Sequence, residues 1–281
     1  MHPVTSHTAG LLEGAIDLHL HSAPDVDPRR YDDLELAREA ARAGLRAILI
    51  KNHHSSTVER ACLASKVVPE IRVFGGVALN ETVGGLNPAA VHLALRWGAR
   101  QVWMPTRSAQ NHRARQGQPG GLTVLNSSGQ LRPEVEEILR LMAQGDAVLG
   151  TGHLSPEEGA ILVHRARELG VKRILVTHPE WPLTPYPLAL QKELARRGVM
   201  FERCFVSTTH RGGYVPMESI AEAIAEVGVE TTVLSTDSGQ PDTPPPVECL
   251  RLYAERLRAL GFTPDQLRQM MCLNPARLLG L

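Results

Sequence analysis

The sequence predicts an α/β protein built as a closed (β/α)8 barrel, and two observations support this fold class. Short apolar runs recur along the chain with most of their ends roughly 30 residues apart, as in successive strand–helix units. The 281 residues also suit one barrel domain, which commonly needs about 250 residues. A doubly wound open sheet is the weaker alternative, because no G-x-G-x-x-G pattern follows the first run.

Eight of the runs have the composition of strands that are buried on both faces, since nearly all of their residues are apolar. Helical patterns that end at a glycine precede most of them, and glycine commonly caps the C-terminus of a helix. One helix start is marked by Ser155, Pro156 and Glu158, which form a capping box with an early proline. The predicted strands are residues 16–20, 47–50, 71–79, 101–104, 147–149, 173–176, 199–201 and 231–234.

The composition argues against several classes of partner. Lys and Arg number 30, as do Asp and Glu, so the zero net charge favours neither nucleic acid nor an anionic membrane. We expect no signal peptide and no membrane span, because no apolar run approaches the ~18 residues that a span needs. The four cysteines are far apart and are expected to be reduced and buried. The sequence thus predicts a cytoplasmic protein that acts on a small molecule, and it leaves a homo-oligomer open.

The first predicted strand ends in the His-x-His motif formed by His19 and His21. Alternate residues of a strand point to the same side, so the two imidazoles would lie together on one face. Neutral imidazole is a common ligand of zinc and of other transition metals. The motif alone leaves a structural alternative open, in which backbone carbonyls satisfy both rings.

Most histidines of the chain lie at or just beyond the predicted C-terminal ends of strands. In a (β/α)8 barrel these ends meet on the face that carries catalysis. His92 and His164 lie inside predicted helices, and His2 and His7 lie in the N-terminal tail. We expect none of these four to belong to a functional site. Asp237 follows the last strand and adds a carboxylate to the same rim. The histidines at strand ends are His19, His21, His53, His54, His112, His153, His178 and His210.

The interval between the fourth and fifth predicted strands is unusually long. Residues 107–129 within it are rich in Gln, Arg, Asn, Gly and Ser and show no periodicity. A long irregular loop inside a compact domain is usually functional. We expect residues 1–281 to form a single barrel in which this segment crosses the mouth as a lid.

Two histidines on strand 1, one on each of strands 5 and 6, and an aspartate on strand 8 are the pattern by which this sequence resembles the amidohydrolase superfamily. The resemblance covers nearly the whole chain. It implies that His19 and His21 bind one metal ion, and that Asp237 is both a ligand and the proton acceptor. It further implies that His153 and His178 bind a second metal ion or assist catalysis.

The sequence departs from the superfamily at the group that bridges two metal ions. Dinuclear members usually carry a carboxylated lysine or a glutamate on strand 4, where this chain reads Gln101-Val102-Trp103. Lys51 at the end of strand 2 is a candidate, because a desolvated amine can lose its proton and react with CO2 to give a bridging carbamate. The other possibility is a charged Lys51 that binds a substrate carboxylate or pairs with Asp237. The site would then hold one metal ion.

Arginines near the predicted mouth suggest the kind of substrate. Arg107 follows strand 4 and Arg203 lies on strand 7, and guanidinium groups bind planar carboxylates through paired hydrogen bonds. We expect both to bind a small acidic or cyclic amide-like substrate, with an ion pair between Arg203 and Glu202 as the alternative. His53 faces the same way as Lys51 and is expected to contact the substrate or to hydrogen-bond a ligand residue.

The sequence therefore predicts a metal-dependent hydrolase that cleaves an amide, cyclic amide or lactone bond. One or two divalent ions, zinc first and Mn, Fe or Ni as alternatives, would activate water, and Asp237 would shuttle its proton. One alternative is a phosphoesterase of the polymerase-and-histidinol-phosphatase type, with Glu81, His53 and His54 as further metal ligands. The other is a barrel that binds a small ligand or a metal ion without catalysis.

Overall fold

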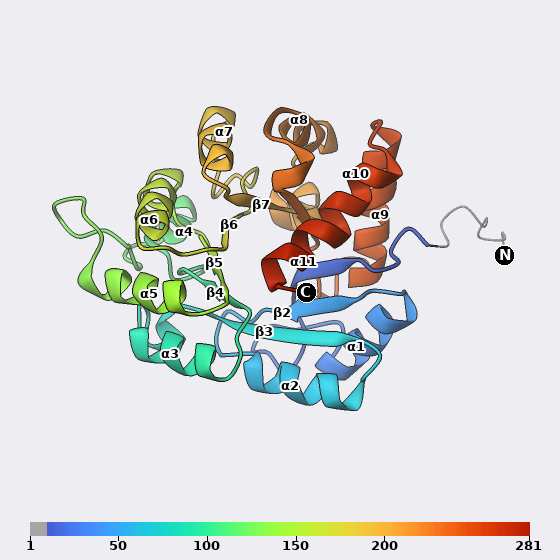
Figure 1. Cartoon of the computed structure of the whole chain (residues 1–281), viewed down its shortest axis with the longest axis horizontal. Coiled ribbons are helices and arrows are strands. Elements are labelled where there is room, and N and C mark those ends of the chain that lie inside the picture. Colours follow the sequence, from blue (N-terminus) through green and yellow to red (C-terminus); the bar gives the residue numbers. More distant parts are fainter. Residues whose placement is uncertain (1–9) are drawn as a thin grey trace.

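The computed structural model describes residues 10–281 and confirms the predicted (β/α)8 barrel. Eight parallel strands lie in the same order in space as in the chain, and the helices surround them (Figure 1). A parallel bridge between Leu20 and Ser238 joins the first strand to the segment after the last. His2 and His7 lie outside the described residues.

All eight predicted strands are present, and their ends differ from the prediction by no more than three residues. The largest difference is at β7, which runs on to Cys204 and so includes the polar residues Glu202 and Arg203. The strands are β1 (Ile16–Leu20), β2 (Ala47–Ile50), β3 (Arg72–Ala78), β4 (Gln101–Trp103), β5 (Val148–Gly150), β6 (Ile174–Thr177), β7 (Met200–Cys204) and β8 (Thr232–Ser235).

Helices follow the strands as the alternation predicts, and α6 begins with the predicted capping box at Ser155. Gly145 ends α5 in an extended conformation and not in the left-handed one that the other helix-ending glycines adopt. The helices are α1 (Asp33–Arg42), α2 (Val58–Val67), α3 (Pro88–Arg96), α4 (Gln110–Arg115), α5 (Pro133–Gln144), α6 (Pro156–Glu168), α7 (Leu188–Arg196), α8 (Met217–Val227), α9 (Pro246–Ala259), α10 (Pro264–Arg268) and α11 (Asn274–Leu279).

The segment 107–129 is more regular than the sequence suggests. It contains the short helix α4, and a parallel bridge joins Ala109 to Leu122. Val124 is fully buried in the cluster of side chains that also holds Val135 and Ile138 of α5. The segment is therefore packed against the barrel over part of its length.

The core has an inner and an outer part. The inner cluster fills the barrel and includes Ile16, Ala47 and Val148, together with Ala276 and Leu279 of α11. Helix α11 therefore packs against the inner side chains at the N-terminal ends of the strands. The outer clusters lie between the strands and the surrounding helices.

Strand β1 contains a β-bulge just before the His-x-His motif. Asp17 pairs with Ile48 and Leu20 pairs with Ile50, so β1 has one residue more than β2 over this interval. Alternation between Asp17 and His19 is thereby broken, and Asp17 does not share the facing of His19. Its carboxylate instead accepts hydrogen bonds from the Thr236 hydroxyl (2.6 Å) and backbone (3.2 Å), and burial raises its pKa to about 7.

All four cysteines are free thiols, but they are not all buried as expected. Cys204 and Cys249 are buried, whereas Cys62 is exposed on α2. Within residues 10–281, no helix has both the length and the apolar composition of a membrane span.

Candidate functional site

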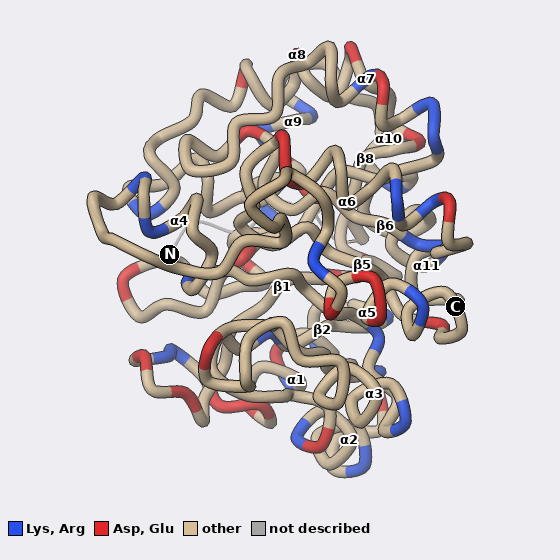
Figure 2. The backbone as a smooth tube through the Cα atoms, turned by 90° about the vertical axis from the view of Figure 1, so that its left-hand side faces the viewer, with Lys and Arg blue, Asp and Glu red and all other residues tan. Residues whose placement is uncertain are grey.

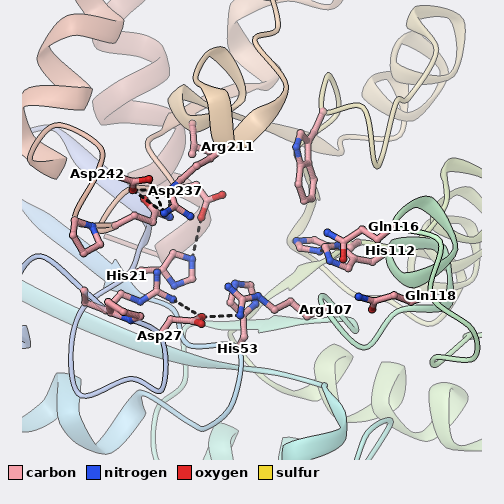
Figure 3. Close-up of a pocket in the computed structure, with 17 residues that line it drawn as sticks. His21, Asp27, His53, Arg107, His112, Gln116, Gln118, Arg211, Asp237 and Asp242 are labelled. Atoms are coloured by element: carbon pink, nitrogen blue, oxygen red, sulfur yellow. Dashed lines mark hydrogen bonds and ion pairs between the residues drawn. The ribbon is translucent and has the colours of Figure 1, made fainter.

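Most of the predicted site residues gather at the C-terminal ends of the strands, at or near a cavity of about 720 Å³. Figure 3 shows His21, His53 and Asp237 on one side of this cavity and His112 across from them. His153 and Trp181 also line it. The expectation that the strand-end histidines converge is therefore met for most of them.

His19, His21 and Asp237 form the centre of the site. Oδ1 of Asp237 lies 3.0 Å from Nε2 of His19 and 2.9 Å from Nε2 of His21. These three ligand atoms lie within 4.8 Å of one another. Nε2 of His178 is 3.6 Å from Oδ2 of the same carboxylate.

Backbone hydrogen bonds between β1 and the residues after β8 fix this arrangement. The Asp237 amide donates to the His19 carbonyl and the His21 amide donates to the Ser238 carbonyl, both at 2.8 Å. The chain turns sharply here, because Asp237 and His178 adopt left-handed φ angles of 53° and 52°. Such angles are costly for non-glycine residues and tend to occur at functional sites.

Gly239 allows the close approach of the last strand to the first. Its φ angle is 136°, and a Cβ at this position would collide with the backbone carbonyl of His21. A side chain here would displace His21 from Asp237.

Lys51 contacts one of these ligand atoms, Nε2 of His19. Its Nζ is 2.9 Å from Nε2 of His19 and 5.3 Å from the centre of the Trp103 ring. Burial lowers the pKa of Lys51 in spite of the opposing charges of Asp237 and Glu202. The inner side of β4 thus carries the Trp103 indole and no acidic group, as the sequence indicates.

Glu202 on β7 is a site residue that the sequence did not reveal in this role. Its carboxylate is fully buried, with Oε2 3.1 Å from Nδ1 of His19 and Oε1 accepting from the Ser235 hydroxyl at 3.1 Å. A carboxylate on one imidazole nitrogen fixes the ring and directs the other nitrogen toward a metal ion. An acidic residue within a predicted buried strand could have indicated this role. The sequence, however, also offered the adjacent Arg203 as an ion-pair partner for Glu202.

The donor set fits a divalent transition metal. Two Nε2 atoms and one carboxylate oxygen point at a common position, and one of the imidazoles has a carboxylate behind it. Burial lowers the pKa of His21 to about 3, so its ring is neutral and able to coordinate a metal ion at neutral pH. For His19, Asp237 and Glu202 outweigh the effect of burial and raise the pKa.

His153 and His112 form a buried pair at the side of the cavity. Their Nδ1 atoms are 2.9 Å apart, so one ring donates to the other. Burial lowers the pKa of His112 to about 4, and it holds that of His153 well below its usual range. His112 belongs to α4, so the segment 107–129 contributes a side chain to the site itself.

Trp181 and His178 form the wall beside this pair. The Trp181 ring lies 5.3 Å from the His178 ring and 5.0 Å from that of His153, in edge-on contacts. Burial also holds the pKa of His178 well below its usual range, so this ring is neutral.

His53 lies at the site, as expected. Its ring stacks on His21 with centres 5.0 Å apart, and its Nδ1 is 2.9 Å from the Thr106 hydroxyl. The Asn80 side chain donates to the same hydroxyl at 2.6 Å. This network supports a role for His53 in holding its neighbour His21, and its remaining edge faces the cavity.

Each arginine at the mouth already has an acidic partner. Arg107 lies 2.7 Å from Asp27, and Arg211 forms paired hydrogen bonds with Asp242 at 2.8 Å (Figure 3). Arg29 is bound by Asp25 at 2.8 Å. Acidic side chains thus balance the charge of the arginines at the mouth. The sequence alone did not indicate this pairing.

Arg203 is not a cavity residue, which corrects the expectation that it binds substrate. It follows the inward-facing Glu202 and therefore points outward from β7, where it is fully buried between the strand and the helices. Its guanidinium pairs with Glu180 and donates to the Gln191 side chain at 3.0 Å and to the Ala223 carbonyl at 3.4 Å. Its role in this position is structural.

The remaining strand-end groups lie on the rim. Glu81 pairs with Arg113 at 2.6 Å, and His210 lies 3.0 Å from Asp242. Nε2 of His54 is 4.0 Å from Asp27. Glu81 and His54 are therefore not gathered around the centre formed by His19, His21 and Asp237.

Comparison with known proteins first defines the class of fold. The structure of an amidohydrolase from Pseudomonas aeruginosa matches with a TM-score of 0.68 and 14% identity over 97% of this chain and 98% of that one. An organophosphorus hydrolase from Deinococcus radiodurans matches with a TM-score of 0.62 and 18% identity over 97% of this chain and 94% of that one. A 2,6-dihydroxybenzoate decarboxylase matches with a TM-score of 0.59 and 12% identity over 96% of this chain and 100% of that one. At these identities the likenesses show the fold alone, which is a (β/α)8 barrel like that of these enzymes.

The chain belongs to a family of unknown function, DUF6282, whose model matches residues 14–202. The matched range holds the His-x-His motif, Lys51, His153, His178 and Glu202, whereas Asp237 follows it. No curated protein matches the sequence.

The structural role of Arg203 predicts a stability effect without an effect on the site. Arg203→Met removes the partner of the largely buried Glu180, and we expect the free energy of unfolding to fall by about 3 kcal/mol or more. Urea unfolding measures this loss, and metal content of the folded protein should not change. Adding Glu180→Gln should restore part of the stability. A variant with normal stability and reduced substrate affinity would contradict this assignment.

The contact between Glu202 and His19 predicts an effect on metal affinity. Glu202→Gln keeps the size of the side chain but removes its charge, and we expect metal affinity to fall about 10- to 100-fold. Competition with a chromophoric chelator measures the affinity directly. Glu81→Gln, which alters a rim carboxylate, is the control and should bind metal normally. Equal affinities in the two variants would show that His19 does not depend on this carboxylate.

Proposed function

We propose that the protein is a metal-dependent hydrolase whose metal ion is held by His19, His21 and Asp237. The observation that carries the proposal is the convergence of two Nε2 atoms on one carboxylate oxygen at the mouth of the barrel, with Oδ1 of Asp237 within 3.0 Å of each of them. The position at the C-terminal ends of the strands, where barrel enzymes carry catalysis, supports it further.

A bound divalent metal ion would polarise a substrate carbonyl and would make water a usable nucleophile at neutral pH. Asp237 would accept the proton of the attacking water at Oδ2, since Oδ1 is engaged by His19 and His21. Burial raises the pKa of Asp237, but His19 and His21 outweigh it and hold the pKa well below its usual range. The carboxylate is therefore ionised at neutral pH and ready to accept the proton.

His178 would assist Asp237 in moving this proton. Its Nε2 lies 3.6 Å from Oδ2, and its neutral ring can receive the proton or return it to the leaving group. The leaving group would be the amine of an amide or cyclic amide, or the alkoxide of a lactone. Trp181 and the segment 107–129 would limit the access of bulk water once the substrate is bound.

The arrangement favours one metal ion over two. Among the described residues, one group of three ligand atoms contains Asp237, and the neighbouring group of His19, His178 and Cys204 shares His19 with it. Trp103 occupies the inner side of β4, where a bridging acid would be expected. His153 shares its Nδ1 with His112, which leaves its Nε2 for a metal ion, but within the described residues His153 belongs to no group of three ligand atoms. Lys51 is then a neutral or charged amine in contact with His19, and the carbamate that would bridge two ions is the second candidate.

Zinc is the ion that the two imidazoles and the carboxylate suit first, with Mn, Fe and Ni as alternatives. Of the further ligands that a phosphoesterase of the polymerase-and-histidinol-phosphatase type would need, His53 lies beside His21, but Glu81 and His54 are not near this centre. Glu81 is bound to Arg113, and His54 faces Asp27. A small-molecule hydrolase in the cytoplasm, with Arg107 and His53 facing the substrate, is therefore the function we propose.

The division of labour between ligand and proton acceptor can be tested by substitution. We expect the His19→Ala/His21→Ala variant to lose its metal and all activity while remaining folded. Asp237→Asn should keep most of the metal but turn over a lactone or amide substrate about 10²- to 10⁴-fold more slowly. Metal analysis, circular dichroism and a panel of lactones, amides and aryl phosphates provide the measurements. Full metal occupancy in the double histidine variant would refute the proposed centre.

The state of Lys51 can be tested through metal stoichiometry. With one metal ion we expect a ratio near one per chain, and Lys51→Ala should still bind it, because Lys51 is not among the three ligands. Reconstitution in CO2-depleted buffer should then leave activity unchanged. A ratio near two, a loss of one ion in Lys51→Ala and recovery of activity with bicarbonate would establish the carbamate instead.

A further inference from the structure

A second cavity, which we call the lower cavity, lies at the opposite end of the barrel. It has a volume of about 690 Å³ and is bordered by the first residues of β6 and β7, by the 3-10 turn before β8 and by α11. Its charged lining residues are Arg167, Lys172, Arg173, Arg197, Arg277 and Glu230. Figure 2 shows Lys and Arg segments gathered around the labels of β6 and α11. In a chain of zero net charge, five cations against one acid is a strong local excess.

Acidic partners compensate only part of this charge. Arg173 lies 2.8 Å from Asp146, and Arg197 lies 3.7 Å from Glu193. Arg167, Lys172 and Arg277 have no carboxylate within ion-pair distance in the part of the chain from residue 10 onward. The mouth of the barrel differs, because each of its arginines is paired.

Arg167 is held rigidly while its charge remains uncompensated. Its Nη atoms donate to the carbonyls of Val171 (3.0 Å), Lys172 (2.9 Å) and Gly198 (2.7 Å). Its Nε is buried and lacks an acceptor among the described residues. Burial lowers the pKa of Arg167, and no acidic group counters this effect. Arg277 is held in the same way, by the Glu230 carbonyl at 2.9 Å.

We propose that the lower cavity binds the phosphate group of a small phosphorylated molecule. Guanidinium and ammonium groups are the usual partners of phosphate, and two of the arginines here are already oriented by backbone carbonyls. The volume lies within the range of small-molecule sites and exceeds what one phosphate group fills. Ile174, Val199 and Leu278 line the remainder and supply apolar surface for the organic part of such a ligand.

This site is distinct from the proposed catalytic centre, and the inference does not depend on it. The lower cavity lies at the N-terminal ends of β6 and β7 and before β8, whereas His178, Glu202 and Asp237 lie at or beyond the C-terminal halves of the same strands. A ligand in the lower cavity is therefore not the substrate. It would bind at the beginning of strands whose other ends lead to His178, Glu202 and Asp237.

Calorimetry on the metal-loaded protein tests the proposal with AMP, inorganic phosphate and adenosine as probes. We expect AMP to bind with a Kd of about 1 mM or tighter, adenosine not to bind, and affinity to weaken as salt is raised. Tighter binding of AMP than of phosphate would identify an organic phosphate as the ligand. Equal affinity would identify free phosphate, and both results support a phosphate site.

Matched variants locate the binding. Lys172 and Arg197 are exposed, so the variant Lys172→Gln/Arg197→Gln should fold normally and bind AMP about 10-fold more weakly or worse. Arg196→Gln, next to Arg197 but outside the cavity lining, is the control and should bind normally. His21→Ala should also bind AMP, because the site lies away from the metal centre. The proposal is overturned if neither anion binds, or if AMP binds the double variant as tightly as the wild type.

Discussion

The closure of the barrel between β1 and the turn after β8 is the constraint on which the site depends. Two backbone hydrogen bonds, from Asp237 to His19 and from His21 to Ser238, complete the ring of strands. The same residues supply the three ligand atoms of the proposed centre. Closing the barrel and assembling the ligands are thus one structural event. A metal ion that binds only the assembled set must stabilise the closed barrel, because it adds its binding energy to the folded state alone.

The burial of the centre sets its charge state. The rings of His21, His53, His153 and His178 lie in a confined space where burial lowers their pKa values, so they are neutral at pH 7. Asp237 stays ionised in the midst of these rings because His19 and His21 contact it directly. One buried carboxylate with neutral imidazoles around it favours a divalent cation at this point. The left-handed backbone at Asp237 and His178 is the strain that accompanies this packing.

The sequence predicted the fold and most of the centre for physical reasons that are local. Apolar runs between glycine-capped helices identify buried parallel strands, and a polar residue just after such a run must lie on the catalytic rim. What failed depended on the exact facing of a residue. Arg203 was expected at the mouth, but β7 extends far enough to send Glu202 inward and Arg203 outward. In β1 a bulge likewise breaks the alternation next to the His-x-His motif. Neither the bulge nor the end of β7 is encoded in the apolar pattern, so alternation could not be carried through them.

The pairing of charged side chains at the mouth could not be predicted from the sequence either. It limits which arginines are available to bind an acidic substrate. Among the mouth arginines Arg211 has two hydrogen bonds to one carboxylate, whereas Arg107 has one contact with Asp27. Arg107 is also 44% exposed, so its ion pair with Asp27 is weakened by solvent. A substrate carboxylate would therefore displace Asp27 from Arg107 more readily than it would displace Asp242 from Arg211. Because Arg107 begins the segment that carries His112 to the side of His153, this exchange would pull on the same segment that borders the cavity.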